Sequence, residues 1–152
     1  MAARPRSSSL RRDAAELYGA ATAFIRLYQF RDRDQALRFG LTVVQAYALD
    51  ILLSADGRRL TELAEALRLD KSTTSRIVAG MKRHGLVEWS RPEHDRRAMR
   101  IVASAEGKRR YERLRRAIVR ENARLLASYG PAARRAAITI LRQLVQRAEG
   151  TW

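Results

Sequence analysis

The chain of 152 residues contains no cysteine. Disulfides, thiolate zinc sites and a cysteine redox switch are therefore excluded, which favours a reducing compartment. Long apolar runs are also missing, because Asp50 and several arginines interrupt the longest of them. Since no run approaches the roughly 18 residues needed to cross a bilayer, we expect a soluble, cytoplasmic protein with no membrane partner.

Acidic residues are scarce. Only 16 Asp and Glu accompany 31 Lys and Arg, which leaves a formal net charge of +15 and indicates a polyanionic partner. The excess is concentrated in residues 105–152, which hold twelve basic and four acidic side chains. Five arginines at helical spacing form a stripe there that either faces solvent or attracts DNA at long range: Arg109, Arg113, Arg116, Arg120 and Arg124.

Groups suited to catalysis are few. The chain has two histidines, His84 and His94, and no glycine-rich phosphate loop. Lys71 beside Ser72 is better explained as the start of a helix than as a base and a nucleophile. We therefore expect no enzyme, no cofactor and no metal site. Aromatic residues are only 7% of the chain, which disfavours stacking of single-stranded bases.

Hydrophobic spacing predicts a mainly α chain with one small β-hairpin, an α+β fold. Residues 1–12 are basic and rich in serine, and they are predicted to form a disordered arm. Two helices are predicted first, over residues 13 to about 30 and 42 to about 55. Two shorter helices follow, over 62–69 with Thr61 as N-cap and over 71–84. Two more begin at about residue 104 and at Pro131. Residues 31–38, RDRDQALR, are predicted to be a polar connector. The segments LVEWS and AMRIVA are predicted to be the two strands of the hairpin, joined by the loop RPEHDRR.

The stretch DKSTTSRIVAGMKRHG, residues 70–85, places four hydroxyl residues, weak helix formers, at the start of a helix. Asp70 is the predicted N-cap and Gly85 the predicted stop. A buried stripe is predicted for Thr74, Ile77, Val78 and Met81. The outer face then holds Ser72, Thr73, Ser75, Arg76, Ala79, and Lys82 or Arg83. Together with the preceding short helix, this stretch has the form of a helix-turn-helix.

Such an outer face suits duplex DNA. Ser and Thr donate to phosphates or base edges, and Arg76 is placed to bind a guanine or a phosphate through two donors. In the hairpin loop, arginines that suit a narrow minor groove surround Asp95: Arg91, Arg96 and Arg97. A purely structural role stays open for both segments, as helix capping for the hydroxyls and as a solvated loop for the arginines.

Residues 41–107 resemble the winged helix-turn-helix of the MarR family of bacterial transcription regulators. The likeness is carried, in the family's order, by LTVVQAYALDIL, LTELAEALRLDKSTTSRIVAGMKRHGLV, HDRR and EGK. The resemblance implies a homodimer on a pseudo-palindromic operator. It also implies that the major groove is read from one helix by Ser72, Thr73, Ser75 and Arg76, with Lys82 on the same helix. In the hairpin, which is the wing of this fold, it implies that Asp95 orients the loop and that Arg96 forms its tip, with Arg97 beside it.

By the same resemblance, residues 13–40 are an N-terminal dimerisation helix and connector, 41–104 the DNA-binding domain and 105–152 the C-terminal dimerisation helices. One departure from the family is Ala103-Ser104, where Leu-Thr is usual, although Ser104 still suits a helix cap. Another individual feature is Gly80, which costs about 1 kcal/mol relative to Ala inside a helix. Gly80 allows either close packing or a close approach to DNA.

The resemblance further implies a repressor that a small phenolic or otherwise amphiphilic molecule releases from DNA. Candidate aromatic residues for such a pocket are Tyr18, Phe24, Tyr28 and Tyr47, each of which is also explained as a core or interface residue. The alternative is a non-sequence-specific, architectural nucleic-acid-binding protein, which the charge of +15 would serve equally.

Overall fold

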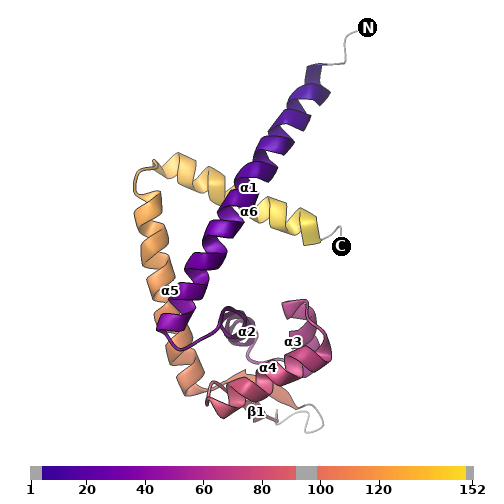
Figure 1. Cartoon of the computed structure of the whole chain (residues 1–152), viewed down its shortest axis with the longest axis vertical. Helices are drawn as coiled ribbons and strands as arrows, with labels where there is room; N and C mark the ends of the chain where they lie inside the picture. Colours follow the sequence, from indigo (N-terminus) through magenta and orange to yellow (C-terminus); the bar gives the residue numbers. More distant parts are fainter. Residues whose placement is uncertain (1–4, 92–98, 150–152) are drawn as a thin grey trace. The chain divides into compact units, whose positions relative to one another are not determined.

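The computed structural model describes residues 5–91 and 99–149. These residues form two compact units, divided after Leu114, and each unit is considered by itself. The elements in chain order are α1 (Pro5–Arg38), α2 (Val43–Ser54), α3 (Leu60–Leu67), α4 (Lys71–Arg83), β1 (Val87–Ser90), β2 (Arg100–Ala103), α5 (Ala105–Leu126) and α6 (Pro131–Glu149) (Figure 1). A mainly helical chain with one two-stranded antiparallel sheet confirms the predicted fold class.

Helix α1 is longer than its sequence pattern predicted. Residues 5–12, assigned to a disordered arm, and residues 31–38, assigned to a connector, both belong to α1, so these two predictions were wrong. Proline is tolerated in the first turn of a helix, where its missing N–H is not needed. The segment 31–38 is polar but consists mainly of good helix formers, and Ala36 within it is buried. Arg31 also pairs with Asp32 at 3.1 Å.

The predicted capping box at the start of α2 is confirmed. The Gln45 backbone N–H donates to Thr42 Oγ1 at 3.3 Å, and the Thr42 backbone N–H donates to Gln45 Oε1 at 2.9 Å. The N-cap predicted for α3 was wrong, because α3 begins at Leu60 and Arg59 precedes it. The Arg59 N–H donates to Glu62 Oε2 at 3.0 Å, so a carboxylate in the first turn accepts from the backbone of the residue that precedes α3.

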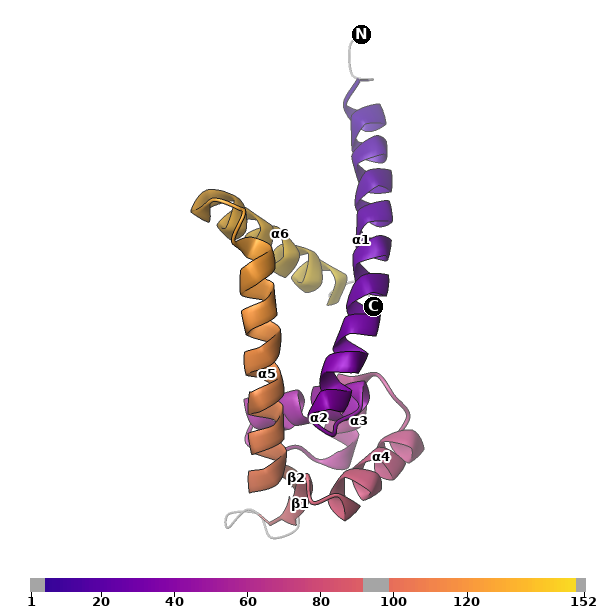
Figure 2. The ribbon, with the colours of Figure 1, turned by 60° about the vertical axis from the view of Figure 1, so that its left-hand side comes forward.

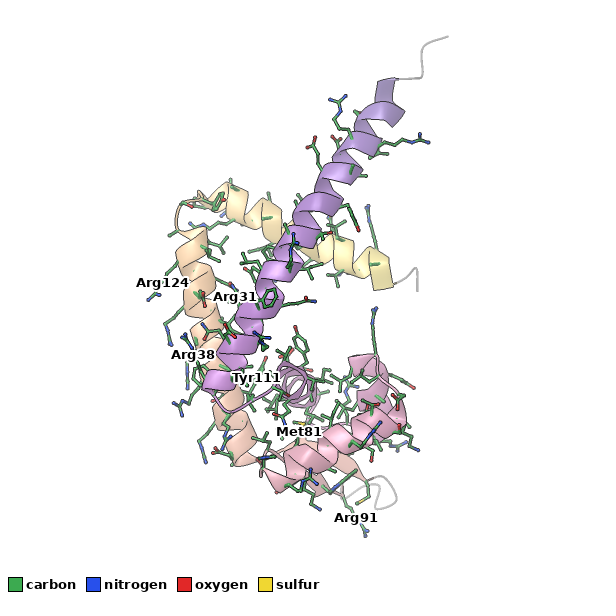
Figure 3. The ribbon with its side chains drawn as sticks, viewed as in Figure 1. Arg31, Arg38, Met81, Arg91, Tyr111 and Arg124 are labelled. Atoms are coloured by element: carbon green, nitrogen blue, oxygen red, sulfur yellow. The ribbon has the colours of Figure 1, made fainter. Side chains whose placement is uncertain are left out.

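The core of the first unit lies between α2, α3, α4 and the hairpin (Figure 1). Its fully buried side chains are Leu41, Leu49, Leu52, Leu63, Thr74, Met81, Leu86 and Ile101. Met81 lies on the side of α4 that faces α2 (Figure 3). Full burial of each leucine or methionine is worth about 1.5–3 kcal/mol. This core fixes which face of α4 is turned inward and which is left to solvent.

The turn between α3 and α4 is closed by a residue in the left-handed region. Arg68 has φ +55°, its N–H donates to the Glu65 carbonyl at 3.0 Å, and the Leu69 N–H donates to the Ala64 carbonyl at 3.0 Å. These two bonds are those of a Schellman motif, in which glycine usually takes the left-handed position. A residue with a Cβ costs roughly 1–2 kcal/mol in this conformation, so Arg68 is locally unfavourable.

The predicted hairpin is confirmed, with Val87 opposite Ala103 and Trp89 opposite Ile101. Its predicted loop lies outside the described residues. Arg58 adds a one-residue third strand, because its N–H donates to the Ile101 carbonyl at 3.0 Å and its carbonyl accepts from the Ile101 N–H at 2.7 Å. The hairpin lies beside the end of α4 (Figure 2). The segment before α3 is thereby joined to the hairpin.

The end of α4, the hairpin and the start of α5 meet at Leu86. The Leu86 N–H donates to the Met81 carbonyl at 2.9 Å, and the Ser104 N–H donates to the Leu86 carbonyl at 3.0 Å. Ser104 Oγ donates to the Gly85 carbonyl at 2.5 Å and accepts from the Gly107 N–H at 3.0 Å. The predicted stop at Gly85 (φ +66°) and the predicted cap at Ser104 are therefore both confirmed.

The second unit contains the rest of α5 and helix α6, which starts at Pro131 as predicted. The apolar side chains of α6 are exposed in the single chain, including Ile138, Leu141 and Val145. Among the described helices none alone has the length and apolar character of a membrane span. Helices α1 and α2 reach that length and composition only as a pair bent by 80°.

A methyl group at Gly107 should disrupt the junction at Leu86. An added Cβ would lie 2.0 Å from the Leu86 carbonyl oxygen, so the Gly107→Ala change should lower the free energy of unfolding by about 1–3 kcal/mol. The matched control is Gly19→Ala in α1, where a Cβ meets nothing within 4 Å and should stabilise the helix by about 1 kcal/mol. Urea unfolding followed by circular dichroism measures both. Equal effects of the two substitutions would contradict this account of Gly107.

Candidate nucleic-acid interface

Helix α4 has one buried and one exposed face, as its sequence predicted. Thr74, Val78 and Met81 are buried and Ile77 is half-buried. Of the side chains predicted to contact DNA from this helix, Thr73 is half-buried and the rest are exposed: Ser72, Ser75, Arg76 and Lys82. The predicted division of α4 is confirmed, and the contact with DNA stays a prediction.

Two of the four hydroxyls at the start of α4 stabilise the helix itself. Asp70 Oδ1 accepts from the Thr73 N–H at 2.8 Å and from Ser72 Oγ at 2.5 Å. The Ser72 hydroxyl, and then Thr73, hold the pKa of Asp70 well below its usual range. Thr74 Oγ1 donates to the Asp70 carbonyl at 2.9 Å. The helix-capping role left open for the hydroxyls is therefore shown for Ser72 and Thr74, which bond to the N-cap residue Asp70. Ser75 is exposed to solvent.

The side chain of Arg76 lies along α4 toward its N-terminal end. Arg76 Nη2 donates to Thr73 Oγ1 at 3.4 Å, a long hydrogen bond that uses one of the five guanidinium donors. Both residues belong to the predicted base-reading set, so the structure brings them together on one face. A guanidinium held by a single weak contact keeps its paired donors available for a guanine or a phosphate.

The C-terminal end of α4 is also basic. Lys82 and Arg83 occupy the last turn, and His84 Nδ1 lies 2.8 Å from the Gly80 carbonyl, so the expected place of His84 at the helix end is confirmed. Around Gly80, a Cβ would meet only Arg83 Nη2, at 3.9 Å, among the described residues. Close packing against the described residues therefore does not explain this glycine, and the close approach to DNA stays a prediction.

The predicted wing residues Asp95, Arg96 and Arg97 lie outside the described residues. Strand β1 ends at Ser90, and Arg91, which follows it, is exposed and projects away from the core (Figure 3). Sequence analysis missed Arg58, whose backbone joins the hairpin as a third strand. A single residue after Gly57 carries no strand periodicity, so no signal in the sequence identified it.

The arginine stripe of α5 is exposed as predicted, at Arg109, Arg113, Arg116, Arg120 and Arg124. Its first members also make contacts within the chain. Arg109 and Arg110 both pair with Glu106, and Arg110, followed by Arg109, lowers the pKa of that carboxyl. The Arg113 guanidinium lies 5.6 Å from the centre of the Phe39 ring. The stripe is therefore a basic surface in which Arg109 pairs within α5 and Arg113 contacts the segment after α1.

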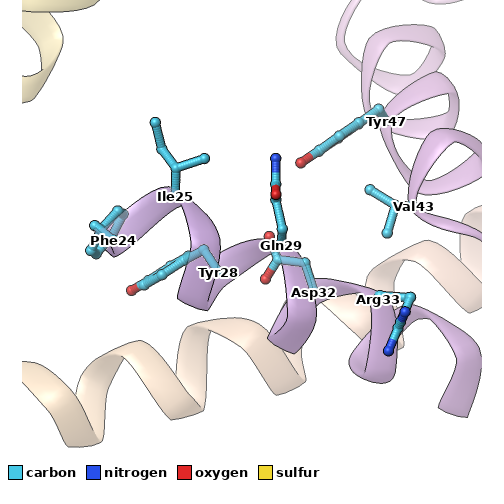
Figure 4. Close-up of a pocket in the computed structure, with 8 residues that line it drawn as sticks. All are labelled: Phe24, Ile25, Tyr28, Gln29, Asp32, Arg33, Val43 and Tyr47. Carbon is cyan, nitrogen blue, oxygen red and sulfur yellow. The ribbon is translucent and has the colours of Figure 1, made fainter. Parts of the chain in front are cut away.

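A pocket of about 470 Å³ lies between α1 and α2 (Figure 4). Its lining consists of Phe24, Ile25, Tyr28, Gln29, Asp32, Arg33, Val43 and Tyr47. Phe24 and Tyr28 stack with ring centroids 3.8 Å apart. Three of the four aromatic residues proposed from the sequence thus line one pocket, whereas Tyr18 lies elsewhere on α1 and is exposed.

A helix-turn-helix followed by a two-stranded hairpin, with the outer face of its second helix exposed, defines the winged helix-turn-helix class. Residues 39–98 match the MarR family model. A MarR family protein from Bacillus stearothermophilus is 29% identical, with a TM-score of 0.84, and the match covers 91% of this chain and 97% of that one. The chain therefore matches the MarR family over residues 39–98 and shares the winged helix-turn-helix fold of this MarR family protein over most of its length.

Two further solved structures share this fold. A MarR transcriptional regulator from Methanosarcina mazei Go1 is 24% identical, with a TM-score of 0.75 and coverage of 90% of this chain and 99% of that one. A mutant of S. aureus MepR bound to an oligodeoxyribonucleotide is 16% identical, with a TM-score of 0.60 and coverage of 86% and 97%. No curated protein matches the chain.

The charge on Asp70 should make the start of α4 sensitive to acid. Because the folded state lowers the pKa of Asp70, its ionised form stabilises the fold above the unfolded pKa of about 4 and is lost as the pH falls further. We expect Asp70→Asn to lower the melting temperature at pH 7, and the difference from wild type to narrow below about pH 4. The control is Glu88→Gln on the exposed face of β1. A difference in melting temperature between Asp70→Asn and wild type that does not change with pH would contradict a stabilising role of the ionised Asp70.

Proposed function

We propose that the chain is a sequence-specific, DNA-binding transcriptional regulator that acts in the cytoplasm as a homodimer on a pseudo-palindromic operator. The observation that carries the proposal is the outer face of α4, where exposed hydroxyls and cations stand on a helix whose inner face is fixed by the core. Short side chains let a helix enter the major groove closely, and their donors match base edges and phosphates.

In this proposal α4 lies in the major groove and the hairpin loop in the adjacent minor groove. Base reading is assigned to the exposed or half-buried set on α4: Ser72, Thr73, Ser75, Arg76 and Lys82. Arg76 carries most of the discrimination, because a bidentate bond to guanine selects one base pair. In the loop, Asp95 orients Arg96 at the tip, with Arg97 beside it.

Dimerisation is supported by apolar side chains that the single chain leaves exposed on its terminal helices. On α1 they include Leu17, Phe24 and Leu27, and on α6 Ile138, Leu141 and Val145. Exposed apolar side chains in this number on one helix indicate an interface, since burying them away from water lowers the free energy. A twofold dimer presents two copies of α4 to half-sites about one DNA turn apart.

We further propose that the protein is a repressor, released from DNA by an amphiphilic effector bound in the pocket between α1 and α2. The stacked rings of Phe24 and Tyr28 offer an apolar wall, and Gln29, Asp32 and Arg33 offer polar groups at its rim. A phenolic molecule fits this combination. Binding there would shift α2 against α1 and so change the separation of the two recognition helices, which controls whether both half-sites are bound.

An architectural, non-sequence-specific role is the second candidate. The exposed arginines of α5 favour it, because contacts to phosphates give affinity without sequence information. The two functions differ in one measurable property, which is whether the protein prefers some duplexes over others at equal salt.

Selection from a pool of random duplexes at about 0.15 M salt tests this difference. The wild-type protein should retain duplexes that share a pseudo-palindrome with half-sites about one turn apart. Arg76→Ala should weaken binding to that operator by about 1–3 kcal/mol and relax the preference at one base pair. Arg120→Ala, the control on α5, should weaken binding equally for all sequences.

Retention of duplexes without any shared motif, with steep loss as salt rises, would favour the architectural role. Equal, sequence-independent losses for Arg76→Ala and Arg120→Ala would remove the base-reading role of Arg76 and leave it as a phosphate contact.

The pocket is tested with a phenolic amphiphile, 4-ethylphenol, by following release of operator DNA in a fluorescence anisotropy titration. Tyr47→Ala removes one aromatic wall, so half-release should need an about 2–10-fold higher concentration, while DNA affinity without effector stays unchanged. Tyr129→Ala, an equally exposed tyrosine outside the pocket, is the control. Identical responses of the two variants, or no release from wild type at saturation, would eliminate this effector site for phenols.

A further inference from the structure

Two residues other than glycine adopt the left-handed conformation among the described residues, Asp56 at φ +50° and Arg68 at φ +55°. Asp is one of the few residues that tolerate this region, because its short polar side chain bonds to the nearby backbone. Arginine has no such compensation. Arg68 therefore occupies a position at which glycine would be more stable.

Nothing within the described part of the chain accounts for an arginine at this position. Its backbone N–H closes α3 by donating to the Glu65 carbonyl at 3.0 Å, a bond that any residue except proline makes. Its side chain is exposed, and among the described residues its guanidinium has no hydrogen-bond or ion-pair partner. The unfavourable backbone conformation is thus not offset by a contact of the side chain with these residues.

The position of Arg68 in the fold suggests the missing partner. Arg68 lies in the turn that joins α3 to α4, two residues before the N-cap Asp70 and three before the exposed Lys71. When the second helix of a helix-turn-helix enters the major groove, the first helix crosses the phosphate backbone, and Arg68 lies at the C-terminal end of that first helix, α3. An exposed cation in the turn is then close to phosphate oxygens rather than to base edges.

We propose that Arg68 binds a phosphate of the DNA backbone next to the groove that α4 occupies. This inference rests on the proposed function of α4 as the recognition helix. It adds a contact that α4 itself does not supply, at a residue whose backbone conformation is unfavourable. Because a phosphate contact carries no sequence information, Arg68 strengthens binding to every duplex and leaves the preferred operator unchanged.

The test combines a melting temperature with the salt dependence of DNA affinity for Arg68→Gly and Arg68→Lys. Arg68→Gly should raise the melting temperature by about 2–4 °C, because strain is removed, and lower the slope of log K against log salt by about 0.9, because one phosphate contact is lost. Arg68→Lys keeps the charge and should keep the wild-type slope. Selection from random duplexes should return the same operator for all three proteins.

The control is Asp56→Gly, which places glycine at the other left-handed position, in the turn after α2. It should raise the melting temperature without changing the salt slope. An unchanged slope for Arg68→Gly, while wild type binds DNA, would overturn the role of Arg68 and leave the proposed function intact. Failure of the wild-type protein itself to bind duplex DNA would instead overturn the proposed function.

Discussion

The arrangement of the DNA-binding unit depends on one residue, Leu86. Its side chain is fully buried, its N–H closes α4 through the Met81 carbonyl, and its own carbonyl accepts from Ser104 at the start of α5. The close approach of Gly107 to the same carbonyl leaves no room for a side chain on α5. Since the end of α4, the hairpin and α5 share this point, the orientation of α4 follows from backbone contacts that its exposed face does not affect. Side chains on that face can therefore differ without changing the orientation of α4.

Several features of the proposed interface are locally unfavourable. Ser75 and Gly80 are weak helix formers within α4, and Arg68 precedes the helix in a left-handed conformation. The costs are offset on the inner side, where Thr74 bonds to the Asp70 carbonyl and Met81 is fully buried. Residues that are unfavourable for local structure are expected on a face that has a function, with compensating contacts on the opposite face. The pattern supports α4 as the functional helix independently of any likeness to known proteins.

Features set by neighbouring residues were predictable from the sequence. The capping box at Thr42, the stop at Gly85 and the start of α6 at Pro131 each depend on a few adjacent side chains, and all were confirmed. The errors arose where the sequence has weak signals. A polar run of good helix formers was taken for a connector, and the pairing of Arg58 joins residues more than forty positions apart. For the pocket, the sequence identified the aromatic residues. It did not show that they line one cavity, because that depends on how α1 packs on α2.

In the proposed function, the distribution of charge assigns affinity and specificity to different parts of the chain. Residues 105–152 carry twelve basic and four acidic side chains, far more excess charge than the DNA-binding domain carries. Contacts to phosphates supply affinity, and contacts to base edges supply the choice of site. In its first half, α4 carries short hydroxyl side chains and only one exposed arginine, Arg76. As a recognition helix it would gain little from non-specific electrostatic attraction to phosphates. Under the proposed function, discrimination would rest on hydrogen-bond geometry, while the basic surface elsewhere would raise the local concentration of DNA for every sequence alike.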